Sequence, residues 1–232
     1  MSTQDSAASI SVTPNGPYIV TGTVPLSVET IGVNEKGESW EYLPGRTFEV
    51  RRVYALCRCG ESANKPFCDG THGTIAFDGT ETASFEPFAE HAERVPGPSM
   101  ELAEAPELCA FARFCDGSGS IWKLIGETDS EPVRELVKHQ ETHCPSGRLV
   151  VSENATGAAI EPAYDPAIVL LEDPQKECSG PIAVRGGIRL TSSQGTAYET
   201  RNRMTLCRCG KSANKPFCDG THADVAFEDG LS

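Results

Sequence analysis

A sixteen-residue block that is rich in metal-binding residues occurs twice in this chain. Residues 57–72 read CRCGESANKPFCDGTH and residues 207–222 read CRCGKSANKPFCDGTH, so the copies differ only at Glu61 and Lys211. Each copy supplies three cysteines and one histidine: Cys57, Cys59, Cys68 and His72 in the first, and Cys207, Cys209, Cys218 and His222 in the second. Thiolate and imidazole groups are the ligands that zinc and iron–sulfur clusters prefer. The repeat therefore predicts two equivalent metal or iron–sulfur sites.

Ligand types alone leave two kinds of site open. Three cysteines and one histidine are a known zinc set, although zinc-binding cysteine pairs are commonly separated by two to four residues rather than by one. Iron–sulfur clusters accept the same donors. Disulfides are disfavoured because the N-terminal sequence has no basic segment followed by an apolar segment, as a secretory signal would. We therefore expect a cytoplasmic protein whose cysteines are ligands.

The composition excludes several classes of function. The chain has 232 residues and a formal net charge of −13, which disfavours binding to nucleic acid or to an anionic membrane. No apolar run approaches the roughly 18 residues that a membrane span needs. Neither a phosphate-binding loop nor a Ser-His-Asp constellation is visible. We expect no enzyme with its own organic substrate.

The segments that precede the two motifs also resemble each other, so the repeat covers a small domain in each half. Residues 16–26 read GPYIVTGTVPL and residues 180–190 read GPIAVRGGIRL. Short apolar runs broken by Gly and Pro predict strands joined by turns, and hence a mainly β fold with loops and short helices. The predicted organisation is a disordered tail over 1–14, a first β unit over 15–88, a different segment over 89–165 and a second β unit over 166–232.

The middle segment carries three further cysteines, Cys109, Cys115 and Cys144. A helix is predicted from Glu131 to Gln140, with Ser130 as its N-cap. Its apolar face is formed by Val133, Leu136 and Val137.

The pattern C-x-C-x₂-S-x₃-P-x-C-D-G-T-H in both blocks resembles the defining motif of the CDGSH (NEET) iron–sulfur family, with Thr71 and Thr221 where many members have Ser. The resemblance implies a [2Fe–2S] cluster in each motif, with one iron on the first two cysteines and the other on the third cysteine and the histidine. It also implies that the two β units form an intramolecular pseudo-dimer. Ser62 and Asn64 are candidates for hydrogen bonds to cluster sulfurs.

The middle segment resembles a divergent single-cluster ferredoxin domain. This resemblance implies a small α+β unit. Its cysteines fit C-x₂-A-x₂-C followed by a distal C-P, where Ala112 replaces the middle cysteine of the bacterial ferredoxin pattern. Three cysteines allow a [3Fe–4S] cluster, or a [4Fe–4S] cluster with a fourth ligand. Candidates for that ligand are His143, His139 and Asp116. The alternative is that the three cysteines are buried apolar residues. Cys178 is left over and is interpreted as a buried thiol.

These features predict an iron–sulfur protein that transfers electrons or clusters, with a reductase or an apo-acceptor protein as its partner. The alternative is a structural zinc-binding interaction module. Internal repetition predicts a monomer with intramolecular pseudo-symmetry. Because only a neutral imidazole binds iron, we expect acid to release the clusters. The Glu61/Lys211 difference, taken alone, predicts a higher reduction potential at the second site, since a nearby cation favours the reduced state.

Overall fold

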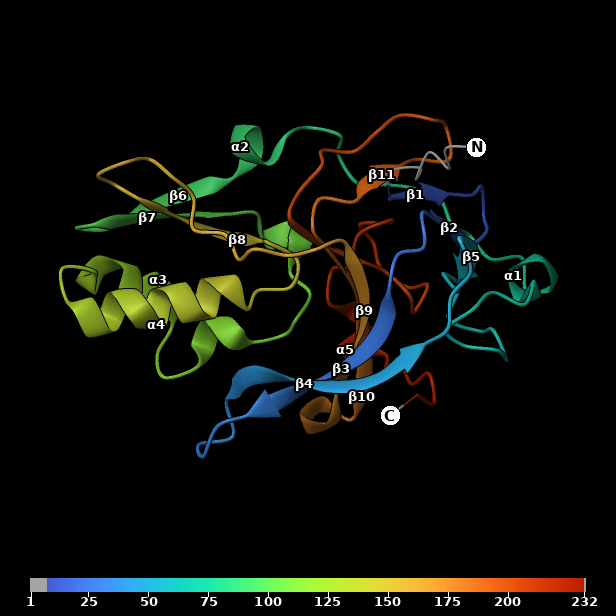
Figure 1. The fold of residues 1–232 in the computed structure, drawn as a ribbon, viewed down its shortest axis with the longest axis horizontal. Helices are drawn as coiled ribbons and strands as arrows, with labels where there is room; N and C mark the ends of the chain where they lie inside the picture. The colour runs from blue at the N-terminus through green and yellow to red at the C-terminus, as the bar shows by residue number, and fades with distance from the viewer. Residues whose placement is uncertain (1–7, 232) are drawn as a thin grey trace, which may run out of the picture.

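The computed structural model describes residues 8–231. The protein is mainly β with short helices, with 31% of residues in strands and 18% in helices, as the sequence predicts (Figure 1). The strands are β1 (Ser9–Val12), β2 (Tyr18–Thr21), β3 (Leu26–Val33), β4 (Ser39–Phe48), β5 (Val53–Leu56), β6 (Glu93–Pro96), β7 (Met100–Glu104), β8 (Leu149–Glu153), β9 (Ala167–Asp173), β10 (Cys178–Arg185), β11 (Arg189–Thr191) and β12 (Arg203–Leu206). The α-helices are α1 (Thr71–Thr74), α2 (Phe88–His91), α3 (Ile121–Leu124), α4 (Glu131–Thr142) and α5 (Thr221–Asp224), and the 3₁₀ turns are η1 (Pro106–Leu108), η2 (Phe114–Asp116), η3 (Ile125–Glu127) and η4 (Pro174–Lys176).

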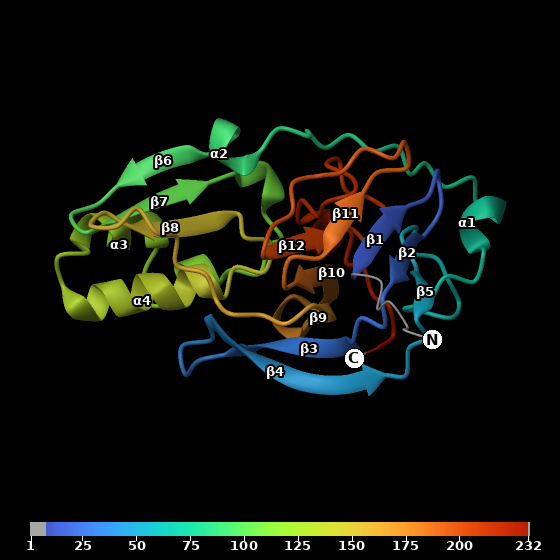
Figure 2. The same ribbon diagram turned by 45° about the horizontal axis from the view of Figure 1, so that its top comes forward.

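The two halves of the chain exchange strands. One sheet has the order β11-β1-β2-β5 and the other has the order β12-β10-β9-β3-β4, so each contains strands from both halves. Strand β11 lies parallel to β1, with Leu190 opposite Ile10, and β3 lies parallel to β9, with Leu26 opposite Ile168. The second half thus adds β11 to the sheet of the first, and the first half adds β3 to the sheet of the second, as a pseudo-two-fold axis between the halves requires. The two sheets lie together in both views (Figures 1 and 2).

A shared hydrophobic core explains the exchange. Strand β2 alternates buried and half-buried residues, which is the period of a strand with one face on a core. The core takes side chains from both halves, among them Val20 and Leu26 from the first and Ile168, Ile182 and Leu190 from the second. Neither half therefore buries its apolar face alone, and the pairing supplies the missing cover.

The middle segment forms a separate unit with its own core. Strands β6, β7 and β8 make an antiparallel sheet, and α3 and α4 lie beside it, at the left of both views (Figures 1 and 2). The predicted helix is confirmed, since α4 begins at Glu131 after Ser130 at the N-cap. The Ser130 side chain makes no capping hydrogen bond; its carbonyl oxygen accepts one from the backbone N–H of Arg134. Val137 is buried on the face that packs against the sheet.

The predicted disordered tail is wrong at Ser9–Val12, which form β1. Ile10 and Val12 are buried in the shared core, and the strand pairs with β2 and β11. The apolar alternation of this short strand was hidden among small polar residues. Residues 1–7 of the predicted tail lie outside the described part of the chain. Within residues 8–231 no helix is both long enough and apolar enough to span a bilayer.

Candidate iron–sulfur sites

Each motif folds back on the strand that leads into it. The backbone N–H of Cys57 donates to Pro66 O at 2.8 Å, and the N–H of Cys68 donates to Ala55 O at 3.0 Å. The second motif repeats both bonds at 2.9 Å, from Cys207 to Pro216 O and from Cys218 to Thr205 O. These bonds place the third cysteine beside the first two, although eight residues separate it from the nearer one.

The donor atoms are arranged as two pairs in each motif. The Sγ atoms of Cys57 and Cys59 lie 3.8 Å apart, and Cys68 Sγ lies 3.3 Å from His72 Nδ1. The matching separations in the second motif are 3.7 Å and 3.3 Å. Two ligands of one tetrahedral metal lie about 3.8 Å apart for a pair of sulfurs and about 3.5 Å apart for sulfur and nitrogen. Each pair therefore fits one iron of a two-iron cluster, with Nδ1 as the ligating nitrogen.

A tight turn carries each histidine to its cysteine. Gly70 and Gly220 precede α1 and α5 with φ of 93° and 90°, a conformation that glycine adopts without strain. The Asp69 carboxylate accepts hydrogen bonds from the backbone N–H groups of Thr71 and Ala63, at 3.0 and 2.8 Å. These bonds lower the pKa of Asp69, and they fix the turn that presents His72 four residues after Cys68.

The Ser62 hydroxyl is engaged by the backbone of its own loop. The Ser62 hydroxyl donates to Phe67 O at 2.7 Å, and it accepts from the backbone N–H of Asn64 at 3.1 Å. Ser212 makes the equivalent bond to Phe217 O at 2.8 Å. These hydrogen bonds stabilise the loop between the second and third cysteines. The serines therefore help to position the cysteines through the backbone.

Comparison with known protein families agrees with this geometry. Residues 15–73 and 179–223 match the family model described as iron-binding zinc finger CDGSH type. Each matched segment contains one of the two motifs, and we name the two segments the first and second CDGSH domains. No curated protein and no solved structure matches the chain. The middle segment lies between the two matched ranges.

The two CDGSH sites differ in their exposure although their motifs are nearly identical. Cys68 and His72 are half-buried in the first domain, whereas Cys218 and His222 are only 2% and 3% exposed in the second. Burial lowers the pKa of His222 to about 4 and raises the pKa of Cys218. No pattern within the motifs indicates this difference, because the middle segment contributes to the cover.

That cover is formed by the chain between η1 and η2. Asn214 Nδ2 donates to Glu107 O at 2.9 Å, whereas the equivalent Asn64 is exposed. A Cβ atom placed on Gly220 would lie 3.3 Å from both Cys109 O and Phe111 Cβ. The same atom on Gly70 would meet nothing within 4 Å.

The arginine inside each C-x-C pair is buried but is neutralised only in the second domain. Arg208 pairs with Glu172 at 2.7 Å and also with Asp229. Arg58 is 1% exposed and donates to the carbonyl oxygens of Gly16 and Gly79, both at 2.8 Å. Among residues 8–231 its Nη1 has no hydrogen-bond partner. A buried cation beside the first site therefore lacks the carboxylates that its counterpart has.

We expect the first site to have the higher reduction potential, contrary to the order that Glu61 and Lys211 alone suggest. Glu61 and Lys211 line the same open groove, which also contains Cys59. Neither charge therefore acts on one site alone. The unneutralised guanidinium of Arg58 stabilises added negative charge, by about 2 kcal/mol or on the order of 100 mV. Redox titration of Cys68→Ala and Cys218→Ala proteins, each retaining one CDGSH site, measures the order. A higher potential at the second site would contradict this expectation.

The three remaining clustered cysteines line a single cavity in the middle unit. Cys109, Cys115 and Cys144 surround a space of about 310 Å³ including its open mouth, together with Ala112 and Arg148. Burial raises the pKa of Cys115 to about 12, so the free thiol is protonated at neutral pH and would release its proton on binding a metal. The Arg148 guanidinium pairs with Glu104 at 2.5 Å and also faces the cavity, where it would stabilise an anionic cluster.

None of the three candidates for a fourth ligand lines this cavity. The His139 ring stacks on Trp40 at a centroid distance of 4.0 Å, and the His143 ring packs on Phe114 at 5.2 Å. Asp116 is exposed on the adjacent turn. The position between the outer cysteines is filled by buried Ala112, which has no donor atom. The residues present therefore fit a cluster with three protein ligands.

Cys178 is buried at the start of β10, opposite Asp173 of β9. Burial raises its pKa, as expected for an inert thiol in a strand.

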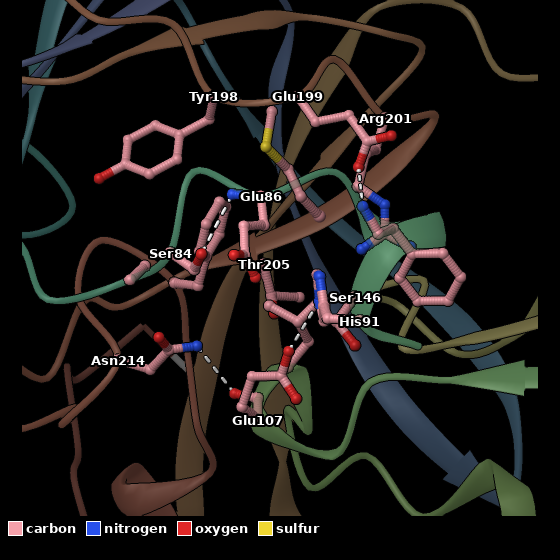
Figure 3. Close-up of a pocket in the computed structure, with 15 residues that line it drawn as sticks. Ser84, Glu86, His91, Glu107, Ser146, Tyr198, Glu199, Arg201, Thr205 and Asn214 are labelled. Atoms are coloured by element: carbon pink, nitrogen blue, oxygen red, sulfur yellow. Dashed lines mark hydrogen bonds and ion pairs between the residues drawn. The ribbon is translucent and has the colours of Figure 1, made fainter. Parts of the chain in front are cut away.

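A further groove lies where the second CDGSH domain meets the middle segment (Figure 3). His91 Nε2 and Glu107 Oε1 lie 2.9 Å apart across it, and Glu199 accepts the backbone N–H of Phe88 at 2.8 Å. These contacts, with that of Asn214 to Glu107, fasten the linker and the middle unit to the second domain (Figure 3).

Proposed function

We propose that the protein is a one-electron carrier with a [2Fe–2S] cluster in each CDGSH domain and a third cluster at Cys109, Cys115 and Cys144. The observation that carries the proposal is the pairwise arrangement of donors in both motifs. Bound iron–sulfur clusters supply reversible one-electron oxidation and reduction. The chain holds each iron, screens its charge and controls its contact with solvent. No organic substrate is required.

The donor pairing favours two irons over one zinc. A structural zinc ion draws four ligands to one point, with every ligand pair at about 3.5–3.8 Å. Within residues 8–231, no three His, Cys, Asp or Glu side chains are placed to hold one ion. Each motif instead presents a two-sulfur pair and a sulfur–nitrogen pair. This supports the cluster over the zinc-binding interaction module.

The burial of Cys218 and His222 in the second domain favours electron transfer. Burial protects a cluster from solvent but does not prevent electron tunnelling. The half-buried Cys68 and His72 of the first domain favour a second candidate function, which is delivery of its cluster to an apo-acceptor protein. Cys59 lies beside an open groove with exposed Ile75 and Lys211, and we propose that the partner protein docks there. Because each sheet already contains strands of both halves, a second copy of the chain is not needed, and we propose a cytoplasmic monomer.

Two assays on the full chain separate these functions. An electron carrier is reduced and reoxidised repeatedly by a reductase and a one-electron acceptor, with its iron content unchanged. A cluster donor loses iron and sulfide to an apo-ferredoxin in proportion to the cluster that the acceptor gains. Loss of iron in every redox cycle would contradict the carrier function.

Replacing Ala112 by cysteine should convert the central cluster from [3Fe–4S] to [4Fe–4S], because the new thiol would lie between the two outer cysteines of the ferredoxin pattern. The measurement is electron paramagnetic resonance of the oxidised protein with an iron assay. The [3Fe–4S] signal of the parent should disappear and iron should rise by about one per chain. Ala112→Ser is the matched control and should keep the parent signal. A parent protein without that signal would contradict the three-iron assignment.

A further inference from the structure

The chain segment that carries Cys109 lies directly against the second CDGSH motif. A Cβ atom at Gly220 would lie 3.3 Å from Cys109 O and from Phe111 Cβ, so the segment packs closely over this glycine. Phe111 has φ of 55°, which turns the chain over the motif. Cys109, which lines the central cavity, therefore lies close to Gly220 in the turn between Cys218 and His222.

Several polar contacts hold this packing in place. Arg113 pairs with buried Asp173 of β9 at 2.5 Å, and Asn214 of the motif holds Glu107 O at 2.9 Å. On the other side of the cavity, Arg203 of β12 donates to Cys144 O at 3.0 Å. The central cavity is therefore fixed to the second domain from both sides.

The two CDGSH motifs also touch each other directly. A Cβ atom on Gly60 would lie 2.7 Å from Cys209 O, and one on Gly210 would lie 2.5 Å from Cys59 O. Closely packed protein thus connects the central cavity to the second site and the second site to the first. The open groove is lined by Cys59 of the first motif, together with Gly210 and Lys211 of the second.

We propose that Cys109–Arg113 is an electron bridge, which couples the central cavity to the second CDGSH site and makes the first site the exit to the partner protein. This proposal rests on the three-cluster function proposed above. It assigns the buried second site to the middle of an internal relay. The sequence repeat, which makes the two CDGSH sites look equivalent, hides this difference in role.

The relay moves one electron at a time and needs no bond to form or break. A reduced flavoprotein or iron–sulfur protein gives one electron to the central site. That site is then oxidised by one electron as the second site is reduced by one, and the same exchange follows between the second site and the first. A one-electron acceptor protein at the first site removes the electron. The residues of Cys109–Arg113 are positioning residues, apart from the ligand Cys109.

The test is the spin relaxation of reduced CDGSH sites, measured by pulsed electron paramagnetic resonance on iron-loaded protein. A nearby paramagnetic centre speeds relaxation, and the effect falls steeply with distance. Cys68→Ala protein retains the central and second sites, and its CDGSH signal should relax severalfold faster than that of Cys218→Ala protein, which retains the central and first sites. Adding Cys144→Ala to empty the central cavity should remove this difference.

A matched glycine pair gives the same test without removing a ligand. Gly220→Ala and Gly70→Ala impose the same backbone strain, because both glycines have positive φ, but only the Gly220 position meets the Cys109 segment. Gly220→Ala should slow relaxation of the second site's signal, and Gly70→Ala should leave it unchanged.

Two results would overturn the inference in distinguishable ways. Full iron content with equal relaxation in the Cys68→Ala and Cys218→Ala proteins would contradict the bridge and leave the proposed function standing. Iron confined to the CDGSH domains would contradict the central cluster of the proposed function, and the bridge with it. An unchanged signal in Gly220→Ala protein, at full iron content, would also contradict the bridge.

Discussion

The first CDGSH site should lose its iron in acid at least about tenfold faster than the second. A proton and an iron compete for the same imidazole nitrogen, so the site that admits water loses the competition first. His72 is half-buried, whereas His222 is only 3% exposed, and burial lowers the pKa of His222 to about 4. A lowered pKa means that the neutral, iron-binding form persists to lower pH, with each pKa unit worth a factor of ten in protonation.

This difference is measured by following visible absorbance and iron release after a jump to about pH 5. Cys218→Ala protein reports the first site and Cys68→Ala protein reports the second. His72→Cys in the first reporter is expected to slow the loss, since a thiolate replaces the proton-sensitive imidazole. Equal rates at the two sites would show that the middle segment does not protect the second.

Arg203→Ala should reduce the free energy of unfolding by about 3–5 kcal/mol, since it leaves a buried carboxyl group without its partner. Arg203 is 1% exposed and pairs with Glu141, whose side chain is fully buried, and with Glu161 at 2.9 Å. Burial raises the pKa of Glu141 to about 8 even with Arg203 in place. The pair joins β12 of the second CDGSH domain to the end of α4.

The loss of stability caused by Arg203→Ala should grow as pH rises above about 8, which is the folded-state pKa of Glu141 in the parent. Glu141 has a folded-state pKa above its unfolded value of about 4.3, so its contribution is fully present below that value and declines as pH rises through the folded pKa. Removing Arg203 raises the folded-state pKa of Glu141 further, so the decline in the free energy of unfolding continues to higher pH. Denaturant unfolding at several pH values measures it, with Glu161→Gln as the control, because Glu161 is partly exposed. A loss below 1 kcal/mol, or one independent of pH, would contradict this role.

The sequence was sufficient for features that depend on local spacing. Each ligand set and helix α4 follow from residues within about twenty positions of each other, and the repeat of the flanks follows from aligning the two halves of the sequence. Asn64 and Asn214 show where such reasoning ends. They occupy the same position in the same motif, yet only Asn214 binds the middle segment, at Glu107 O. That contact joins residues more than a hundred positions apart, and no local pattern encodes it.

The pairing of the two halves was expected from the family resemblance alone, and the neutralisation of the arginines was out of reach for the same reason. Arg58 and Arg208 both follow the first cysteine of their motifs, and their charges differ in effect only because Glu172 and Asp229 reach Arg208 in the folded chain. Similarly, His143 precedes the candidate ligand Cys144, but its ring packs against Phe114 and does not line the cavity. Spacing identifies donors, and tertiary packing decides where they point.

The most direct test of the iron–sulfur assignment is the amount of iron, zinc and acid-labile sulfide per chain in anaerobically purified protein. It should be combined with electron paramagnetic resonance before and after reduction with dithionite. We expect about seven irons and about eight sulfides per chain, with a signal in the oxidised state from the central site and new signals from the CDGSH sites on reduction. Zinc in place of iron, with no signal in either state, would contradict the account.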